Sequence, residues 1–217
     1  MDSRKHYFDY LRVAAIFAVM MIHISADNWL EAGVRSFEWQ VFNFYDSLVR
    51  FGVPVFVMIS GALFLNPDKD IPVKKLYTKY IFRILIAFVF WSFLYAARGY
   101  MKTGDMIDAA DKFLRGHYHL WFMYLIIGLY MIVPFVRQIA GSKALTKYFL
   151  VLALIFASIL PECANIISVF SEKWAELLRN IINYELRLQF VAEYTGYFLL
   201  GYVLDRADIS PKLERMI

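Results

Sequence analysis

Long apolar runs, separated by short polar connections, make up most of the chain. A helix that crosses a membrane needs about 20 consecutive, mostly apolar residues. Six runs approach or meet that length: Phe8–Trp29, Tyr45–Leu65, Tyr80–Ala97, His119–Val136, Tyr148–Leu160 and Phe190–Leu204. No low-complexity tract or long linker interrupts them, so residues 1–217 predict a single all-α domain, a polytopic transmembrane helix bundle of about six spans.

The charges of the connections predict how these spans are oriented. Basic residues collect before the first run and in every second connection after it: Arg4, Lys5, Lys69, Lys74, Lys75, Lys79, Arg137, Lys143, Lys147, Arg206, Lys212 and Arg215. The other connections carry mixed or acidic charge: Asp27, Glu31, Glu38, Asp105, Asp108, Asp111, Glu162, Glu172 and Glu176. Because positively charged connections stay in the cytoplasm, we expect a cytoplasmic N-terminus.

The connection between the fifth and sixth runs contains a segment with helical periodicity. In residues 168–188 charges occupy one face, and apolar side chains recur at helical spacing on the other: Trp174, Leu177, Leu178, Ile181 and Ile182. This pattern predicts an amphipathic helix on the outer surface of the membrane or capping the bundle. A structural cap is the simpler interpretation, and a partner-binding role is the alternative.

Composition and net charge agree with a membrane protein. The chain is 60% hydrophobic and 18% aromatic, with a mean hydropathy of +0.51, which is not typical of a soluble globular protein. The net charge of +4 comes from basic residues between the apolar runs, so it indicates orientation rather than nucleic-acid binding. The lone Cys163 excludes an internal disulfide, and the long first run lacks the cleavage site of a signal peptide.

Two ionisable side chains interrupt the first apolar run. Arg12 and His23 lie eleven positions apart, and at about 100° per residue eleven steps return a helix to nearly the same face. They are separated by roughly 16 Å along the helix axis, around half of the hydrocarbon core. Because ionisable residues inside a membrane are costly, this polar stripe predicts a functional site.

Each member of the stripe also has a structural explanation. His23 could be hydrogen-bonded to a neighbouring helix, or a buried neutral imidazole could act as a general base. Arg12 could extend to the cytoplasmic headgroups, or it could hold an anionic partner. Asp9 lies one turn before Arg12 and could pair with it locally.

The second and third runs carry further candidates. Pro54 predicts a bend in the second run, and Ser60 and Gly61 predict the close approach of another backbone. Taken alone, these features indicate packing more often than binding. A basic cluster at the start of the third run suits the phosphates of a nucleotide-like donor, but it equally fits positive-inside charge and lipid headgroups. Its members are Lys74, Lys75, Lys79 and Arg83.

The remaining candidates lie at the outer ends of the fourth and sixth runs. His117, His119 and Trp121 stand together, but no further His or Cys is near enough in sequence to complete a metal site. An aromatic belt with an interfacial histidine is therefore the simpler interpretation. Glu193 could orient His23, neutralise Arg12 or lie at the interface. No phosphate-binding glycine loop, GxSxG, HExxH or CxxC motif supports a soluble enzyme.

Four segments, spread in order over nearly the whole chain, resemble the acyltransferase family 3 of integral membrane proteins: FDYLRVAAIFAVMMIH, FGVPVFVMISGALFL, HLWFMYLIIGLYMIVPFVR and YFLLGYVLD. The resemblance extends to the membrane half of bacterial membrane-bound serine racemases. It implies a multi-pass O- or N-acyltransferase that takes an acyl group, often acetyl, from cytoplasmic acyl-CoA and passes it to a cell-surface carbohydrate. Family members have about ten spans, so the resemblance predicts a chain that is incomplete at its C-terminal end.

The resemblance also assigns roles to individual residues. His23 matches the essential histidine of the family and Arg12 its paired cation. Of two family arginines at the start of the third span, Arg83 matches the second, whereas Tyr80 occupies the first position with Lys79 beside it. We therefore expect His23 to be catalytic and the following residues to bind acyl-CoA or the acceptor: Arg12, Lys79, Arg83, Ser60, Gly61, His119, Trp121 and Glu193.

The expected function is transfer of an acyl group, expected to be acetyl, from cytoplasmic acyl-CoA (acetyl-CoA) to a hydroxyl or amine of a cell-surface carbohydrate or other envelope acceptor. We expect the protein to lie in the bacterial plasma membrane and to hold no resident cofactor or metal. A small-substrate transporter or flippase-like module would use the same polar stripe without consuming acyl-CoA. A purely structural or sensory protein would tolerate leucine in place of Arg12 and His23, because the substitution relieves an intramembrane cost.

Overall fold

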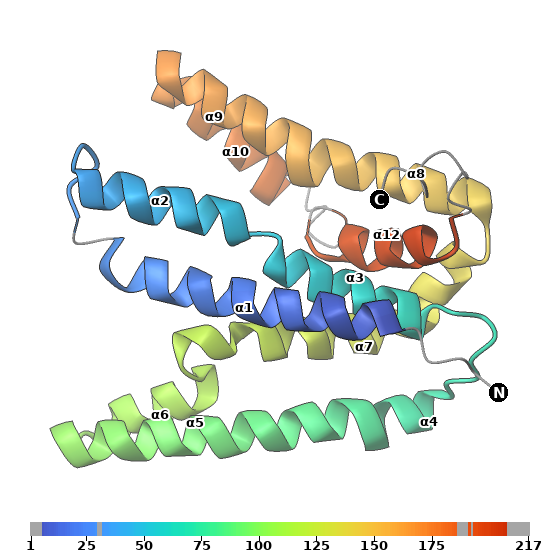
Figure 1. Cartoon of the computed structure of the whole chain (residues 1–217), viewed down its shortest axis with the longest axis horizontal. Helices are drawn as coiled ribbons and strands as arrows, with labels where there is room; N and C mark the ends of the chain where they lie inside the picture. Colours follow the sequence, from blue (N-terminus) through green and yellow to red (C-terminus); the bar gives the residue numbers. More distant parts are fainter. Residues whose placement is uncertain (1–5, 30–31, 186–190, 192, 208–217) are drawn as a thin grey trace. The chain divides into compact units, whose positions relative to one another are not determined.

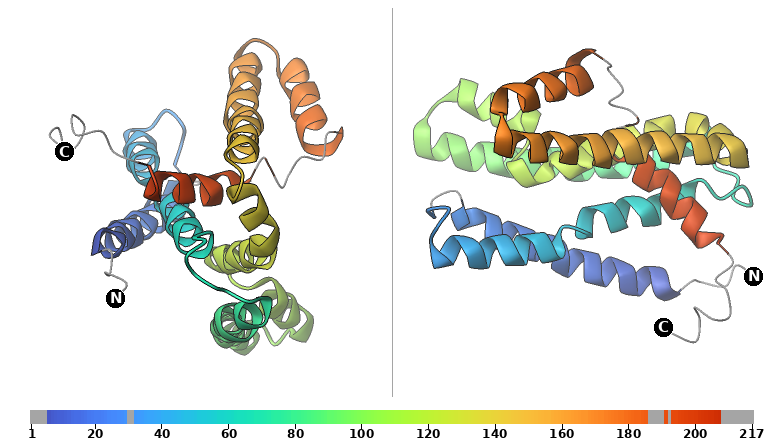
Figure 2. Two further views of the ribbon diagram at one scale, coloured as in Figure 1. Left: turned by 90° about the vertical axis from the view of Figure 1, so that its right-hand side faces the viewer. Right: turned by 90° about the horizontal axis from the view of Figure 1, so that it is seen from above.

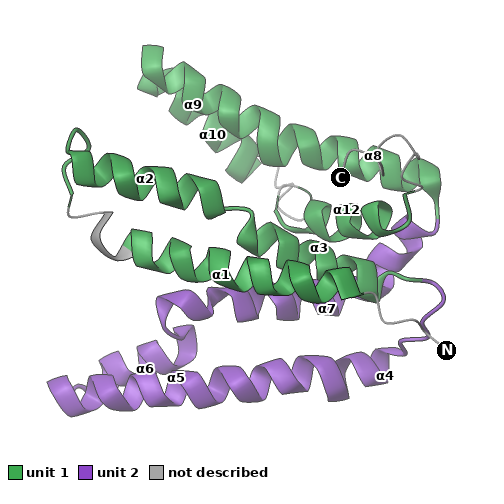
Figure 3. Ribbon diagram, in the orientation of Figure 1, with its two compact units in different colours: residues 1–66, 142–217 green, residues 67–141 purple. Residues whose placement is uncertain are grey.

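The computed structural model describes residues 6–29, 32–185, 191 and 193–207, and these form helices joined by short connections, without a β-strand among them (Figure 1). The all-α class predicted from the apolar runs is therefore confirmed. The chain divides into two compact units, one of residues 1–66 with 142–217 and the other of residues 67–141 (Figure 3). The basic residues Arg4, Lys5, Lys212 and Arg215 lie outside the described ranges.

The first unit contains three helices from the N-terminal part of the chain, and the rest from its C-terminal part. Its elements are α1 (His6–Trp29), α2 (Phe37–Val49), α3 (Gly52–Phe64), α8 (Lys143–Leu154), η3 (Ile155–Ile159), α9 (Leu160–Phe170), α10 (Glu172–Asn180), η4 (Ile181–Glu185) and α12 (Thr195–Asp205). Helix α1 lies alongside α2 and α3 (Figure 2).

Helix α1 has one face for packing and another for lipid. The small side chains of Ala15 and Ala18 are buried, and they face the start of α3, where a Cβ on Gly52 would lie 3.0 Å from the Cβ of Ala18. Tyr10, Phe17 and Ile24 recur every seven residues on the opposite face and are 62–76% exposed. Large exposed apolar side chains at this spacing are what a bilayer-facing helix requires.

A break separates α2 from α3 inside the second apolar run. Pro54 has no backbone N–H, and its ring collides with the carbonyl four residues earlier, which belongs to Arg50. Helix α2 accordingly ends at Val49, residues 50–51 form a turn, and α3 begins at Gly52. The bend expected at Pro54 is therefore present, displaced toward the preceding turn.

Helices α3 and α12 cross at very short range. A Cβ added to Gly61 would lie 1.7 Å from the carbonyl oxygen of Phe198, and one added to Gly201 would lie 2.0 Å from that of Met58. Phe198 is fully buried at this crossing. The prediction that Gly61 admits another backbone is confirmed, and its partner is α12.

The second unit is a helical hairpin followed by one long helix. Helices α4 (Val73–Lys75), η1 (Leu76–Ile81) and α5 (Phe82–Thr103) run on without interruption, and α6 (Met106–Arg115) packs back on α5. Gly104, with a φ of 67°, ends α5, and Asp105 caps α6 by accepting hydrogen bonds from two backbone N–H groups. Helix η2 (Tyr118–Leu120) then leads into α7 (Trp121–Ala140).

Five helical segments in the described part of the chain are long and apolar enough to cross a membrane: His6–Ala26, Phe37–Phe64, Val73–Thr103, Met106–Ala140 and Lys143–Phe170. They contain or overlap the first five predicted spans, and the fifth extends well beyond Tyr148–Leu160 at both ends. The structure therefore confirms a helical bundle with several apolar helices of spanning length.

The sixth predicted span, Phe190–Leu204, differs from the expectation. Helix α12 begins only at Thr195, after a bend at Glu193 and a turn at Tyr194, and Phe190 and Ala192 lie outside the described residues. Its 11 residues reach about 16 Å, roughly half of the hydrocarbon core. The apolar run thus supplies a short helix packed on α3 and α8.

The predicted amphipathic segment, residues 168–188, spans parts of three elements. Its first residues end α9, and α10 and η4 supply helix over most of the remainder, while residues 186–188 lie outside the described ranges. Ala175 and Ile182 are buried, whereas Trp174, Leu177 and Ile181 are exposed. Helix α10 packs against α9, and its position at the outer membrane surface stays a prediction.

Candidate active site

Arg12 lies in the first half of α1 and already has an acidic partner. Its Nη1 atom donates a hydrogen bond to Oδ1 of Asp9 over 2.8 Å, and the two side chains are 39% and 35% exposed. The local pair predicted from the sequence is therefore present. Because a guanidinium carries five N–H donors in a planar fork, the pair with Asp9 leaves donors available for a second anion.

His23 lies three turns further along the same helix. It is half-buried, as Arg12 is, and both side chains fall at the border between the buried face of Ala15 and Ala18 and the face exposed to lipid. The unbroken helix from His6 to Trp29 holds the two groups at different depths, about 16 Å apart at 1.5 Å per residue. The geometry therefore supports the polar stripe as one continuous feature of α1.

A buried carboxylate in α2 was not among the residues selected from the sequence. Asp46 is 4% exposed, accepts a hydrogen bond from Nε of Arg50 at 2.7 Å and forms a salt bridge with Nη2 of the same residue at 2.6 Å. Among the described residues, Asp46 is the only buried one whose side chain is ionisable. An aspartate inside an apolar run, followed four residues later by an arginine, is the signal that would have identified it.

Ser60 and Gly61 take part in packing. The Ser60 hydroxyl donates a hydrogen bond to the carbonyl of Phe56, one turn earlier in the same helix, over 3.0 Å, and Gly61 faces the backbone of α12. These contacts account for both residue types at the helix crossing. Their role in substrate binding stays a prediction.

Glu193 is exposed and borders a groove between α8 and α12. The groove has a volume of about 270 Å³, and its other lining residues, mainly apolar, are Leu150, Ala153, Leu154, Ala157, Ser158, Gly196, Tyr197 and Leu200. The carboxylate that pairs with Arg12 in this structure belongs to Asp9. Neutralisation of Arg12, one of the roles considered for Glu193, is thus already supplied by a residue of α1.

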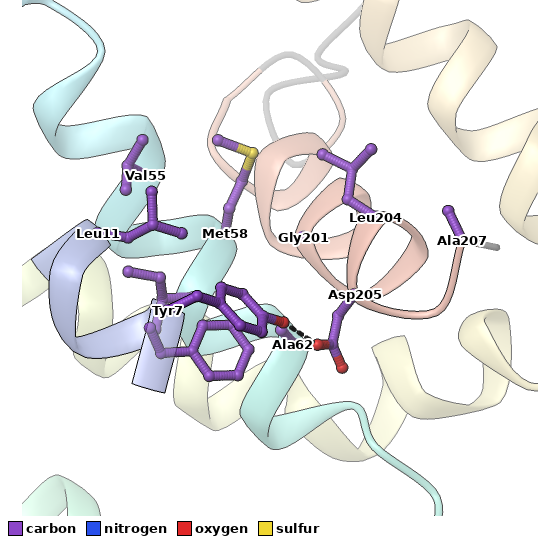
Figure 4. Close-up of a pocket in the computed structure, with 11 residues that line it drawn as sticks. Tyr7, Leu11, Val55, Met58, Ala62, Gly201, Leu204, Asp205 and Ala207 are labelled. Atoms are coloured by element: carbon purple, nitrogen blue, oxygen red, sulfur yellow. Dashed lines mark hydrogen bonds between the residues drawn. The ribbon is translucent and has the colours of Figure 1, made fainter. Parts of the chain in front are cut away.

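A second groove of about 430 Å³ lies where the first turns of α1 meet α3 and the end of α12 (Figure 4). Most of its lining is apolar, with Leu11, Val55 and Met58 facing the end of α12. Its polar contact is a hydrogen bond from the Tyr7 hydroxyl to Asp205. The bond ties the first turn of α1 to the last turn of α12, so it fixes the end of the helix that carries Arg12.

The cations predicted for donor binding in the second unit lie on one exposed stretch. Lys79 is in η1 and Arg83 is in the first turn of α5, and both side chains are exposed. The Lys79 ammonium lies 5.8 Å from the ring centroid of Tyr80. This stretch can attract phosphates electrostatically, and its role in donor binding stays a prediction.

The histidines before α7 form an aromatic cluster with Tyr95 of α5. The Nδ1 atoms of His117 and His119 are 2.8 Å apart, and the ring centroids of these histidines lie 4.4 Å and 5.2 Å from that of Tyr95. Trp121, the next candidate, is 43% exposed. The described residues contain no group of three His, Cys, Asp or Glu side chains that could hold a metal ion.

Comparison with protein families decides the assignment. A family model described as an acyltransferase domain matches residues 5–216, nearly the whole chain. The chain belongs to acyltransferase family 3. No match was found for it among curated proteins or among solved structures.

Membership of acyltransferase family 3 identifies the chain as a membrane acyltransferase with several membrane-crossing helices. It favours the transferase interpretation of the polar stripe over the transporter interpretation. The stripe places an imidazole and a guanidinium on one helix, and an imidazole is a common general base. The identity of donor, acyl group and acceptor belongs to the proposal that follows.

Proposed function

We propose that this protein transfers an acetyl group from cytoplasmic acetyl-CoA to a hydroxyl or amine of a carbohydrate at the outer face of the bacterial plasma membrane. The observation that carries the proposal is the polar stripe of α1. Arg12 and His23 share one face of an unbroken helix within a membrane acyltransferase. Two such groups at different depths suit a donor that enters from the cytoplasmic side of the membrane, near Arg12, and an acceptor that meets its acyl group near His23.

Arg12 is the proposed anchor for the donor. Acetyl-CoA carries phosphates, which a guanidinium binds through charge-assisted hydrogen bonds. Asp9 holds one donor of Arg12, so the phosphate would use the remaining N–H groups. Lys79 and Arg83 are the further basic candidates, since both are exposed cations at the start of the third apolar run.

His23 is the proposed general base. Its neutral imidazole accepts the proton of the acceptor hydroxyl while the oxygen attacks the thioester carbonyl carbon. The C–O bond forms, the tetrahedral intermediate collapses, and the C–S bond breaks to release coenzyme A, whose sulfur receives the proton from the imidazolium. The products are the acetylated acceptor and free coenzyme A, with His23 neutral again.

Binding of acetyl-CoA to the purified chain in detergent tests the donor assignment. Arg12→Gln should raise the Kd about tenfold, because one charge-assisted contact at a partly exposed site is lost. Arg179→Gln is a matched control: Arg179 is 37% exposed, against 39% for Arg12, and is likewise paired with an acid, Glu172. Equal affinities for the two variants, or no saturable binding by the folded wild-type chain, would contradict the proposal.

A further inference from the structure

The second unit contains a basic pocket that the proposed donor site and catalytic residue do not use. It lies between α5, α6 and the start of η2 and has a volume of about 570 Å³. Its lining residues are Tyr95, Arg98, Gly99, Lys102, Lys112, Gly116, His117 and Tyr118. Three of them are basic and none is an acid, so the pocket favours an anionic ligand.

The cations converge because of the way α6 folds back on α5. Arg98 and Lys102 are one helical turn apart, a spacing at which like charges repel. Lys112 of α6 reaches over Gly99, where an added Cβ would lie 3.6 Å from its Nζ atom. Lys112 is paired with Asp108 at 2.5 Å, whereas within the described ranges no acid lies within salt-bridge distance of Arg98 or Lys102.

The pocket also presents aromatic faces. The ring of His117 lies 4.4 Å from that of Tyr95 and 4.7 Å from that of Tyr118, and Tyr118 is 57% exposed. Tyr118 is the exposed ring of the three, and an exposed ring beside hydrogen-bond donors suits a ligand that has both an apolar face and polar edges. A sugar ring has these properties, and a carboxylate or phosphate on it would meet the cations.

We propose that this basic pocket binds an anionic sugar unit, carrying a carboxylate or a phosphate, of the carbohydrate that accepts the acyl group. The proposal rests on the proposed function and gives its acceptor a chemical class. The length of α5 also supports the proposal. Arg83 and Lys102 are 19 residues apart on this helix, which corresponds to about 28 Å, so the pocket and the predicted cytoplasmic cluster lie at opposite ends.

Equilibrium binding of two hexasaccharides tests the basic pocket. Hexagalacturonate carries a carboxylate on each ring and maltohexaose carries none, so the purified chain should bind the first more tightly. The double variant Arg98→Gln/Lys102→Gln should raise the Kd for hexagalacturonate about tenfold, because two exposed charged contacts are lost. The double variant Arg115→Gln/Arg179→Gln controls for net charge, because it also removes two cations and neither arginine belongs to the pocket lining.

Coenzyme A serves as the third probe, because its phosphates and adenine ring would also suit cations beside aromatic rings. The double variant should leave coenzyme A affinity unchanged. A selective loss of coenzyme A affinity would overturn the acceptor assignment, and equal binding of the two hexasaccharides would overturn the anionic one. Since the readout is binding, it is separate from acetyl transfer: a His23→Gln variant that binds hexagalacturonate but transfers nothing supports both proposals.

Discussion

Replacing Gly61 with alanine tests the closest contact in the first unit. The new Cβ would lie 1.7 Å from the carbonyl oxygen of Phe198, 2.6 Å from its carbonyl carbon and 3.0 Å from its Cα. These are backbone atoms of α12, so no side chain can rotate out of the way. An ordinary contact begins near 3.4 Å. The two helices would therefore have to move apart locally until the distance from the new Cβ to the Phe198 oxygen grows from 1.7 Å to about 3.4 Å.

The energetic cost follows from that displacement. Forcing extra volume into a packed core costs typically about 1–3 kcal/mol, and more where the backbone itself must move. Alanine would recover up to about 1 kcal/mol, because it loses less backbone entropy than glycine in a helix. We therefore expect Gly61→Ala to lower the free energy of unfolding by about 2 kcal/mol or more.

Unfolding in mixed micelles, titrated with a denaturing detergent and followed by tryptophan fluorescence, measures this change. Gly128→Ala in α7 is the matched control, because a Cβ there meets nothing within 4 Å. The control should be neutral or stabilising by up to about 1 kcal/mol. If Gly61→Ala is as stable as Gly128→Ala, the close crossing of α3 and α12 is refuted.

Three further substitutions give distinct outcomes. Arg50→Leu should lower the free energy of unfolding by about 1–2 kcal/mol, because Asp46 stays buried without its cation; unchanged stability in the same titration would argue against that burial. Ser92→Ala should raise the free energy of unfolding by about 1 kcal/mol, since within the described residues the Ser92 hydroxyl is buried without a hydrogen-bond partner. A loss of stability would show that the hydroxyl has a partner. Asp9→Asn should lower the Kd for acetyl-CoA severalfold by freeing Arg12, and a weaker affinity would mean that Asp9 instead orients Arg12 for the donor.

Local pattern was sufficient to predict the helices and the polar stripe. The length of an apolar run and the helical repeat are properties of adjacent residues, so five long apolar helices and the shared face of Arg12 and His23 follow from the sequence alone. Pro54 gave the bend for the same reason. In the described part of the sixth run, the helix α12 begins only at Thr195.

Packing between segments that are distant in the sequence could not be predicted from local pattern. Gly61 indicated a close approach, but its partner α12 lies more than 130 residues away in the chain. Asp46 was overlooked because its burial depends on neighbouring helices. The basic pocket needed the turn at Gly104, which folds α6 back and brings Lys112 to Arg98 and Lys102.

The catalytic role of His23 is the central claim, and acetyl transfer measures it most directly. The purified chain, reconstituted in lipid vesicles with radiolabelled acetyl-CoA and an envelope carbohydrate extract, should label the acceptor, and the label is counted after separation from the donor. His23→Gln should lower transfer at least about 100-fold, as expected for the loss of a general base, while acetyl-CoA binding is retained. A His23→Gln variant that transfers acetyl at the wild-type rate would contradict the account.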